Sequence, residues 1–297
     1  MQAVVKPVTP TSQARGVRGY LAYKDRGWYI LGYLLLAIIA LWTVLPVYWM
    51  LVTSVKPDAA AYDVQTSIIP REMTLQHYNS MIFHSQFPVF FRNSFLVAAG
   101  TTLISTFVAA MAAYSLVRLR FAGRTAVARL LIYSYLAPAS VLFIPIFVMM
   151  VKLHLTNSMP GLVLSYLTFT VPFCTWMLMG YLRSVPLELE EAALVDGATR
   201  WQALWRIILP LAAPAVVVVA VFSFTLSWNE FLYALVLVQN QSVMTAPVGL
   251  AFLQVGDVFY WGEMMAAASF MSIPPLLLYF FGQRWVVAGW TVGAVKG

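Results

Sequence analysis

Long apolar stretches restrict the fold of this chain more than any other feature. A helix needs about 20 predominantly apolar residues to cross the hydrocarbon core of a bilayer. Six stretches are long and apolar enough, namely residues 28–52, 93–117, 128–151, 160–182, 209–233 and 263–283. Only 10% of the 297 residues are charged, whereas a soluble domain carries roughly a quarter. We therefore predict an all-helical membrane protein with six transmembrane helices.

The distribution of lysine and arginine predicts how these helices are oriented. Cytoplasmic loops of membrane proteins carry an excess of both residues. With both termini in the cytoplasm, 14 of the 18 basic residues lie inside and 4 lie outside. The inner set is Lys6, Arg15, Arg18, Lys24, Arg26, Arg118, Arg120, Arg124, Arg129, Arg183, Arg200, Arg206, Arg284 and Lys296, and the outer set is Lys56, Arg71, Arg92 and Lys152. We expect cytoplasmic termini, and the net charge of +7 indicates topology rather than nucleic-acid binding.

The polar stretches divide the chain into five parts. We expect residues 1–27 to form a mobile cytoplasmic tail and residues 28–55 to form the first transmembrane helix. The apolar run of this helix exceeds the roughly 7–15 residues of a signal-peptide core, so the helix should be retained. Residues 56–92 form an outer segment, residues 93–283 hold the other five helices, and residues 284–297 form a cytoplasmic tail.

The second apolar stretch is rich in small residues, which let helix backbones approach closely in lipid. These residues are Ala98, Ala99, Gly100, Ala109, Ala110, Ala112 and Ala113. We expect this helix to lie inside the bundle. Five of the six stretches contain an internal proline, which can kink a helix: Pro46, Pro138, Pro145, Pro172, Pro214, Pro274 and Pro275.

One cytoplasmic stretch, residues 183–209, has the pattern of two short helices, and we name it the polar segment. Pro186 suits a first helical turn, and the three glutamates that follow it are favoured by the positive end of the helix dipole. Gly197 permits the positive φ that ends a helix. Thr199 and Gln202 have the spacing of a capping box, which would start a second helix running into the fifth span. The apolar face expected for that helix consists of Trp201, Leu204, Trp205 and Ile208.

Two interpretations of the polar segment are open. A helix lying on the bilayer surface would explain the tryptophans. It would not explain Ala192 and Ala193 beside three acidic residues, which form a small and charged surface suited to a groove in a partner protein. The sequence therefore favours a docking site for another polypeptide.

The polar segment resembles the Glu-Ala-Ala loop of permease subunits of binding-protein-dependent ABC importers. The matching pattern is Glu191-Ala192-Ala193, three residues, Gly197, nine residues, then Ile207-Ile208-Leu209-Pro210. Weaker matches accompany it over residues 28–297: Asn93-Ser94, Ala113-Tyr114-Ser115-Leu116-Val117-Arg118, Phe121-Ala122-Gly123-Arg124 and the tail from Val287 to Gly297. The chain is similar to the carbohydrate branch of this family, and its tail is similar to that of the MalG-like second permease subunit.

The resemblance implies a type I ABC importer permease fold and half of a pathway for a sugar or oligosaccharide. It implies a second permease subunit, an ATPase dimer, which would bind ATP and Mg, and an extracytoplasmic solute-binding protein. The residues implied to couple to the ATPase are Glu191, Ala192, Ala193, Asp196, Gly197, Ile207, Leu209 and Pro210. Those implied to meet the binding protein are Gln254, Val255, Gly256 and Asp257, within a second outer segment at 238–262. The outer segment at 56–92 is shorter than in the enteric maltose subunit, so the resemblance does not extend to maltose as the substrate.

Trp228, Asn229 and Glu230 are candidates for the substrate pathway. An ionisable residue at membrane depth is a functional candidate by default. A carboxylate and an amide can hydrogen-bond sugar hydroxyls, and an indole can stack on a pyranose ring. The alternative is that Glu230 makes a hydrogen bond between helices or reaches the membrane interface.

Other classes of protein fit the sequence less well. The chain contains no Gly-x-x-x-x-Gly-Lys-Ser/Thr phosphate loop, so the energy for transport would come from another polypeptide and we expect no enzyme. The three histidines lack metal-ligand spacing with each other, and no catalytic pair can be assembled. A secondary carrier would need repeat symmetry and charged residues at the midplane. A glycerol-3-phosphate importer of the same branch would need arginine near the pathway, and Arg92 is the one candidate.

Overall fold

The computed structural model describes residues 12–58, 68–255 and 258–294, and it describes side chains in these ranges except at 12–27, 139, 254–255, 258–259 and 286–294. The chain divides into two compact units, residues 1–52 and residues 53–297. Each unit is described by itself.

The first unit consists of one long helix, α1, which spans Ser12–Ser54 and enters the second unit with its last two residues. Its apolar part, Trp28–Ser54, is long enough to cross a membrane, as the sequence predicts. Helix α1 begins within the stretch expected to form a cytoplasmic tail, since residues 12–27 are already helical.

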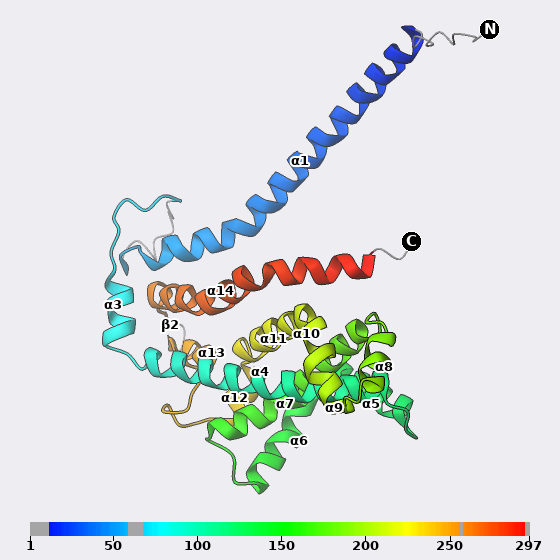
Figure 1. The fold of residues 1–297 in the computed structure, drawn as a ribbon. Helices are drawn as coiled ribbons and strands as arrows, with labels where there is room; N and C mark the ends of the chain where they lie inside the picture. Colours follow the sequence, from blue (N-terminus) through cyan, green and yellow to red (C-terminus); the bar gives the residue numbers. More distant parts are fainter. Residues whose placement is uncertain (1–11, 59–67, 256–257, 295–297) are drawn as a thin grey trace, which may run out of the picture. The chain divides into compact units, whose positions relative to one another are not determined.

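The second unit is a helical bundle with one short hairpin (Figure 1). Its elements are α3 (Gln76–Phe83), α4 (Phe87–Arg118), α5 (Arg124–Leu136), α6 (Ala139–Lys152), α7 (Met159–Leu182), α8 (Glu188–Val195), α9 (Arg200–Ala203), the π-helical η1 (Leu204–Ile208), α10 (Leu209–Leu211), α11 (Ala213–Trp228), α12 (Leu232–Leu237), α13 (Ala246–Ala251), β1 (Gln254–Val255), β2 (Val258–Phe259) and α14 (Trp261–Ala294). The two strands are antiparallel, with Gln254 opposite Phe259 and Val255 opposite Val258.

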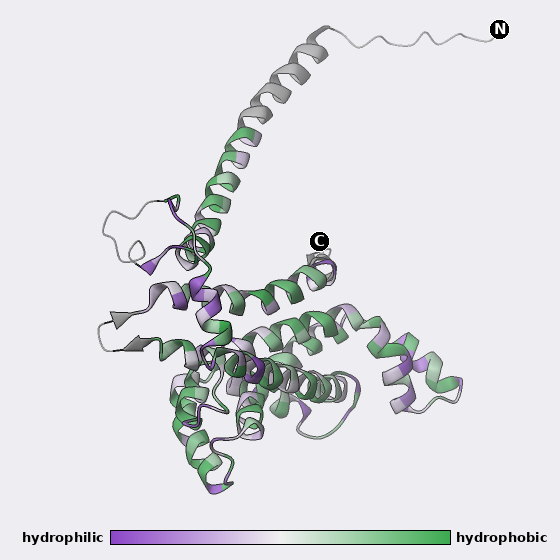
Figure 2. Cartoon of the chain, turned by 90° about the vertical axis from the view of Figure 1, so that its left-hand side faces the viewer, coloured by the Kyte–Doolittle hydropathy of each residue, from purple (hydrophilic) through white to green (hydrophobic). Residues whose placement is uncertain are grey.

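Among the described residues, four helices are long and apolar enough to span a membrane as single elements: Trp28–Ser54, Phe87–Arg118, Met159–Leu182 and Trp261–Trp285. Two further pairs, α5 with α6 and α9–α10 with α11, are bent by 103° and 79°. Counting each bent pair as one span gives the six spans that the sequence predicts. Figure 2 shows apolar residues along the long helices and polar residues mainly at their ends and connections.

The sequence predicts continuous spans at 128–151 and 209–233. Prolines explain why both spans are bent instead. Ala137 has an extended conformation, with ψ of 127°, because a residue before proline is disfavoured in the helical region. The fifth span bends at Ala212, between Pro210 and Pro214. Neither proline can donate a backbone hydrogen bond to the preceding turn. The straight part of this span is therefore shorter than expected and ends at Trp228.

Helix α4 lies in the middle of the second unit and packs against α7 and α11 (Figure 1). Ala98, Ala109 and Ala113 are fully buried on it. Small side chains allow this close packing where lipid gives no hydrophobic driving force between helices. The alanine-bearing face of α4 is therefore in the core, whereas its other face is open, with Leu103 73% exposed.

At the end of the unit that carries α3 and α13, a buried histidine holds α3 against α14. The Nε2 atom of His77 lies 2.8 Å from the Lys56 carbonyl oxygen. Gly262, in the first turn of α14, lies so close to the imidazole ring that any Cβ there would collide with it. One turn further along α3, Ser80 Oγ donates a 2.7 Å hydrogen bond to Glu263.

Gly262→Ala is expected to destabilise the protein, because the hydrogen-bonded His77 ring cannot move aside. Overpacking of this kind costs about 1–3 kcal/mol, so the thermal midpoint in detergent should fall by several degrees. The matched control is Gly180→Ala on α7, where a Cβ would meet nothing within 4 Å. Equal midpoints for the two variants would contradict the packing described.

Candidate functional site

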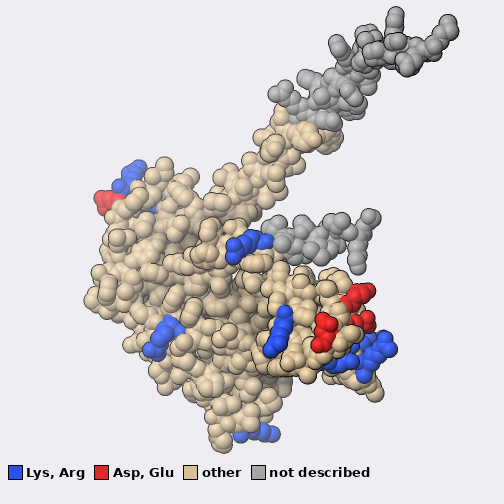
Figure 3. Space-filling model, in the orientation of Figure 1, with Lys and Arg blue, Asp and Glu red and all other residues tan. Residues whose placement is uncertain are grey.

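The first helix of the polar segment, α8, begins at Glu188, two residues after the Pro186 that the sequence places in its first turn, and it ends close to the predicted Gly197. Three glutamates occupy its first turn, where the helix dipole favours negative charge. The helix ends at Val195, and Gly197 follows two residues later with a φ of +87°, which is strained for any residue with a Cβ. Figure 3 shows acidic side chains gathered beside basic ones at the end of the second unit that carries α8 and α9.

The second helix of the polar segment begins with the predicted capping box. The Thr199 side chain accepts a hydrogen bond from the Gln202 backbone N–H at 3.2 Å, and the Gln202 side chain accepts one from the Thr199 N–H at 2.8 Å. Two free N–H groups of the first turn are thereby satisfied. Local hydrogen bonds therefore order the short connection between α8 and α9.

Beyond α9 the structure departs from the single straight helix and single apolar face that the sequence suggests. Residues 204–208 form a π-helix, which winds more slowly than an α-helix and shifts the faces of the residues around it. Leu204 and Ile208 are buried in the core, whereas Trp201 and Trp205 are 54% and 39% exposed. The two indoles contact each other edge to face. The four residues therefore do not share one buried face.

A buried glutamate, Glu190, fixes α8 to the bundle. The sequence alone offers no reason to choose it over its two neighbouring glutamates. Glu190 is 2% exposed and accepts a 2.6 Å hydrogen bond from the Tyr114 hydroxyl. Its second oxygen lies 3.5 Å from Arg118 Nε, which makes an ion pair. Arg118 also donates hydrogen bonds to the carbonyl oxygens of Leu182, at 3.2 Å, and Val185, at 2.6 Å. The Arg118 side chain thus joins the end of α4 to the end of α7 and to the start of α8.

The sequence carried a signal for this cluster. Tyr114 and Arg118 are four residues apart at the end of a helix and so share one face. Arginine at a helix C-terminus is also a common partner for free carbonyl groups. What the sequence could not identify is which of the three neighbouring glutamates faces them.

The residues expected to couple to a partner differ in how exposed they are. Glu191, Ala192, Asp196, Gly197 and Pro210 are exposed, Ile207 and Leu209 are half-buried, and Ala193 is buried against the bundle. Of the two alanines expected on the docking surface, only Ala192 is exposed. We define the exposed face of α8 as Glu188, Glu191, Ala192 and Val195, the last of which is 87% exposed.

In this conformation Trp228 and Glu230 have structural partners. Trp228 is 1% exposed, stacks on Phe224 at 5.5 Å and donates its indole N–H to the Met271 carbonyl oxygen at 3.0 Å. Glu230 accepts hydrogen bonds from the N–H groups of Tyr233, at 2.8 Å, and Ala234, at 3.1 Å, and so caps α12. Asn229 is exposed. For Glu230 these contacts favour the structural alternative over a role in the substrate pathway, and the Glu230→Gln and Glu230→Ala variants test the two.

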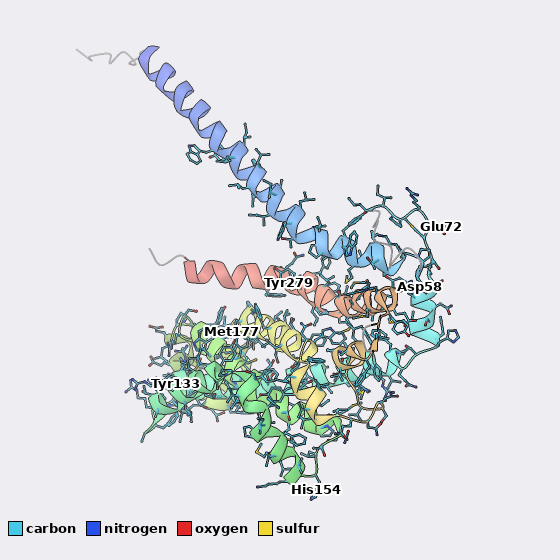
Figure 4. All side chains as sticks on the ribbon, turned by 180° about the vertical axis from the view of Figure 1, so that it is seen from behind. Asp58, Glu72, Tyr133, His154, Met177 and Tyr279 are labelled. Atoms are coloured by element: carbon cyan, nitrogen blue, oxygen red, sulfur yellow. The ribbon has the colours of Figure 1, made fainter. Side chains whose placement is uncertain are left out.

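The second outer segment is tied to α4 and to the loop between α6 and α7. Asn93 donates to the carbonyl oxygens of Ser242, at 2.9 Å, and Met244, at 3.0 Å, and Ser94 Oγ accepts from the Ala246 N–H at 2.7 Å. Asn157, near the loop tip marked by His154 in Figure 4, accepts from the N–H groups of residues 239 and 240. Among the expected binding-protein contacts, Gly256 and Asp257 lie outside the described residues, as do the side chains of Gln254 and Val255.

Comparison with known proteins places this geometry among membrane transport components. A family model described as "Binding-protein-dependent transport system inner membrane component" matches residues 105–292. The inner membrane ABC transporter permease protein YcjP of Escherichia coli is 34% identical over 266 residues, covering 88% of this chain and 94% of the relative. The diacetylchitobiose uptake system permease protein DasC of Streptomyces coelicolor is 35% identical over 254 residues, covering 86% and 92%. The trehalose/maltose transport system permease protein MalG of Thermococcus litoralis is 33% identical over 271 residues, covering 90% and 96%.

The fold is similar to that of a solved transporter chain. A bacterial ABC transporter involved in the import of the acidic polysaccharide alginate contains a chain that aligns with a TM-score of 0.75 at 24% identity, covering 88% of this chain and 97% of that chain. The helical importer permease fold expected from the sequence is thereby confirmed, with the hairpin of β1 and β2 as an addition that the sequence did not predict.

Glu230→Gln is expected to leave uptake and thermal stability close to wild type, because the amide oxygen can still accept one backbone hydrogen bond. Glu230→Ala removes the cap and should destabilise the protein by about 1 kcal/mol. Thermal midpoint and uptake of a radiolabelled sugar are measured in parallel for both variants. Lost uptake in Glu230→Gln at an unchanged midpoint would instead establish a role in the substrate pathway.

Proposed function

Since the chain belongs to the family of binding-protein-dependent transport system inner membrane components, we propose that it is a permease subunit of an ATP-driven importer for a sugar or short oligosaccharide. With a second permease subunit it forms a translocation pathway that opens alternately to the two sides. The substrate class rests on relatives named for diacetylchitobiose uptake and for trehalose/maltose transport.

The observation that carries the coupling role is the two-sided construction of α8. One side is fixed to the bundle by Glu190 and Ala193, while the opposite side exposes Glu191, Ala192 and Val195. A helix of eight residues is not stable alone in water, so α8 persists because the bundle holds it. A held helix with an exposed face that is small, apolar and acidic suits a groove with basic residues at its edge.

The partner that fits this face is the cytoplasmic ATPase, which binds ATP and Mg. Its closure would displace α8, and the displacement would continue along α9 and α10 to the bend at Ala212. The C-terminal tail, residues 284–297, would extend toward the ATPase on the same side of the membrane. On the outer side, the second outer segment at 238–262, including Gln254–Asp257, would receive the solute-binding protein.

Ala192→Trp is expected to abolish co-purification of the ATPase while membrane insertion stays normal, because an indole would fill the space where the groove must approach. The matched control is Ala251→Trp, which changes another exposed alanine on α13, at the opposite end of the unit (Figure 1). Ala193 is unsuitable for this test because its side chain packs against the bundle. Retention of the ATPase by Ala192→Trp would exclude the exposed face of α8 as the docking site.

The substrate class is tested with the purified transporter and its binding protein. A panel of disaccharides and glycerol-3-phosphate is compared for stimulation of ATP hydrolysis. We expect stimulation by a disaccharide and none by the phosphate ester. Stimulation by glycerol-3-phosphate alone would contradict the proposed substrate class and would direct attention to the exposed Arg92.

A further inference from the structure

The contact between α8 and α4 is made by the buried Arg118–Glu190 ion pair and by the 2.6 Å hydrogen bond from Tyr114 to Glu190. The side chains of Arg118 and Glu190 are 7% and 2% exposed. Removing one partner of a buried ion pair leaves an uncompensated charge, which is strongly unfavourable. A force applied to α8 should therefore displace the end of α4 before it breaks this pair.

The other end of α4 is joined to the outer surface in a similar way. Asn93 and Ser94 are 0% and 3% exposed, and they hold the backbone of Ser242, Met244 and Ala246 through three hydrogen bonds. Buried backbone groups that lose such partners carry an energetic cost. This stretch of the outer segment should consequently move with the first turns of α4.

Between these two attachments α4 is one uninterrupted α-helix. The rise of 1.5 Å per residue places Asn93 and Arg118 about 38 Å apart along its axis. Its single proline, Pro88, lies in the first turn, where no backbone hydrogen bond is lost. The covalent route from the polar segment differs, because it passes through a π-helix and a 79° bend before it reaches α11.

We propose that α4 is a rigid connection between the exposed face of α8 and the second outer segment, with the Arg118–Glu190 pair and the Asn93–Ser94 pair as its two attachments. The inference rests on the proposed function, and it adds a route for communication across the membrane. Docking of the loaded binding protein outside changes the position of α8 inside, and ATP-driven motion of α8 changes the outer segment. Such coupling is reciprocal by thermodynamic necessity.

The test measures how strongly the sugar-loaded binding protein stimulates ATP hydrolysis by the full transporter in lipid nanodiscs. Glu190→Gln is compared with wild type and with Arg120→Gln, which changes an exposed charge at the same end of α4. Glu190→Gln should reduce the stimulation, measured relative to the basal rate of the same variant, at least about fivefold. Arg120→Gln should behave like wild type.

A further variant keeps the proposal testable if Glu190→Gln does not assemble. Asn93→Ala breaks the opposite attachment without leaving a buried charge, and it should reduce stimulation in the same way. The double variant Asn93→Ala/Glu190→Gln should be no worse than either single variant, because both interrupt one route.

Wild-type stimulation in Glu190→Gln or in Asn93→Ala, with the ATPase still bound, would overturn the proposal. Independent effects that multiply in the double variant would overturn it as well. These results differ from failure of the proposed function, which would appear as an ATPase that stays bound to Ala192→Trp.

Discussion

Inside a bilayer, a peptide N–H or C=O without a partner costs several kcal/mol, because no water is present to satisfy it. The distribution of polar chemistry in this protein follows from that constraint. Within the spans, several hydroxyl groups are turned back onto their own helix, as in Ser165 to Gly161 and Thr170 to Tyr166. Ser105 and Ser223 hydrogen-bond each other between α4 and α11 at 2.7 Å. Charged and amide side chains that join different elements lie near the ends of α4. Arg118 and Glu190 lie at one end of α4, and Asn93 and Ser94 lie at the other.

This separation gives the two ends of the second unit different surfaces. At one end, the polar segment is held by a buried ion pair and presents a small acidic face. At the other end, side-chain amide and hydroxyl groups of α4 hold a loop that continues to the hairpin at 254–259. A permease subunit needs a surface for an ATPase and a surface for a binding protein. Helix α4 contacts both the polar segment and the second outer segment, which are the candidates for these two surfaces.

The local features of the polar segment could be predicted from the sequence because each depends on a few adjacent residues. Gly197 ends α8 through its own φ angle, and Thr199 and Gln202 cap α9 through hydrogen bonds over three residues. The burial of Glu190 could not be predicted, because three glutamates lie within four positions and only contact with α4 distinguishes them. Likewise, the prolines identified where the third and fifth spans could bend, but the angles of 103° and 79° depend on packing against neighbouring helices.

The central claim is that the exposed face of α8 is the surface on which the ATPase acts. The most direct measurement places a photoreactive amino acid at position 191 of the assembled, transporting complex and identifies what it crosslinks to. The account predicts a crosslink to the ATPase that is absent when the same probe replaces Ala251 on the outer side. Crosslinks from position 191 to lipid alone, in a complex that still couples ATP hydrolysis to uptake, would contradict it.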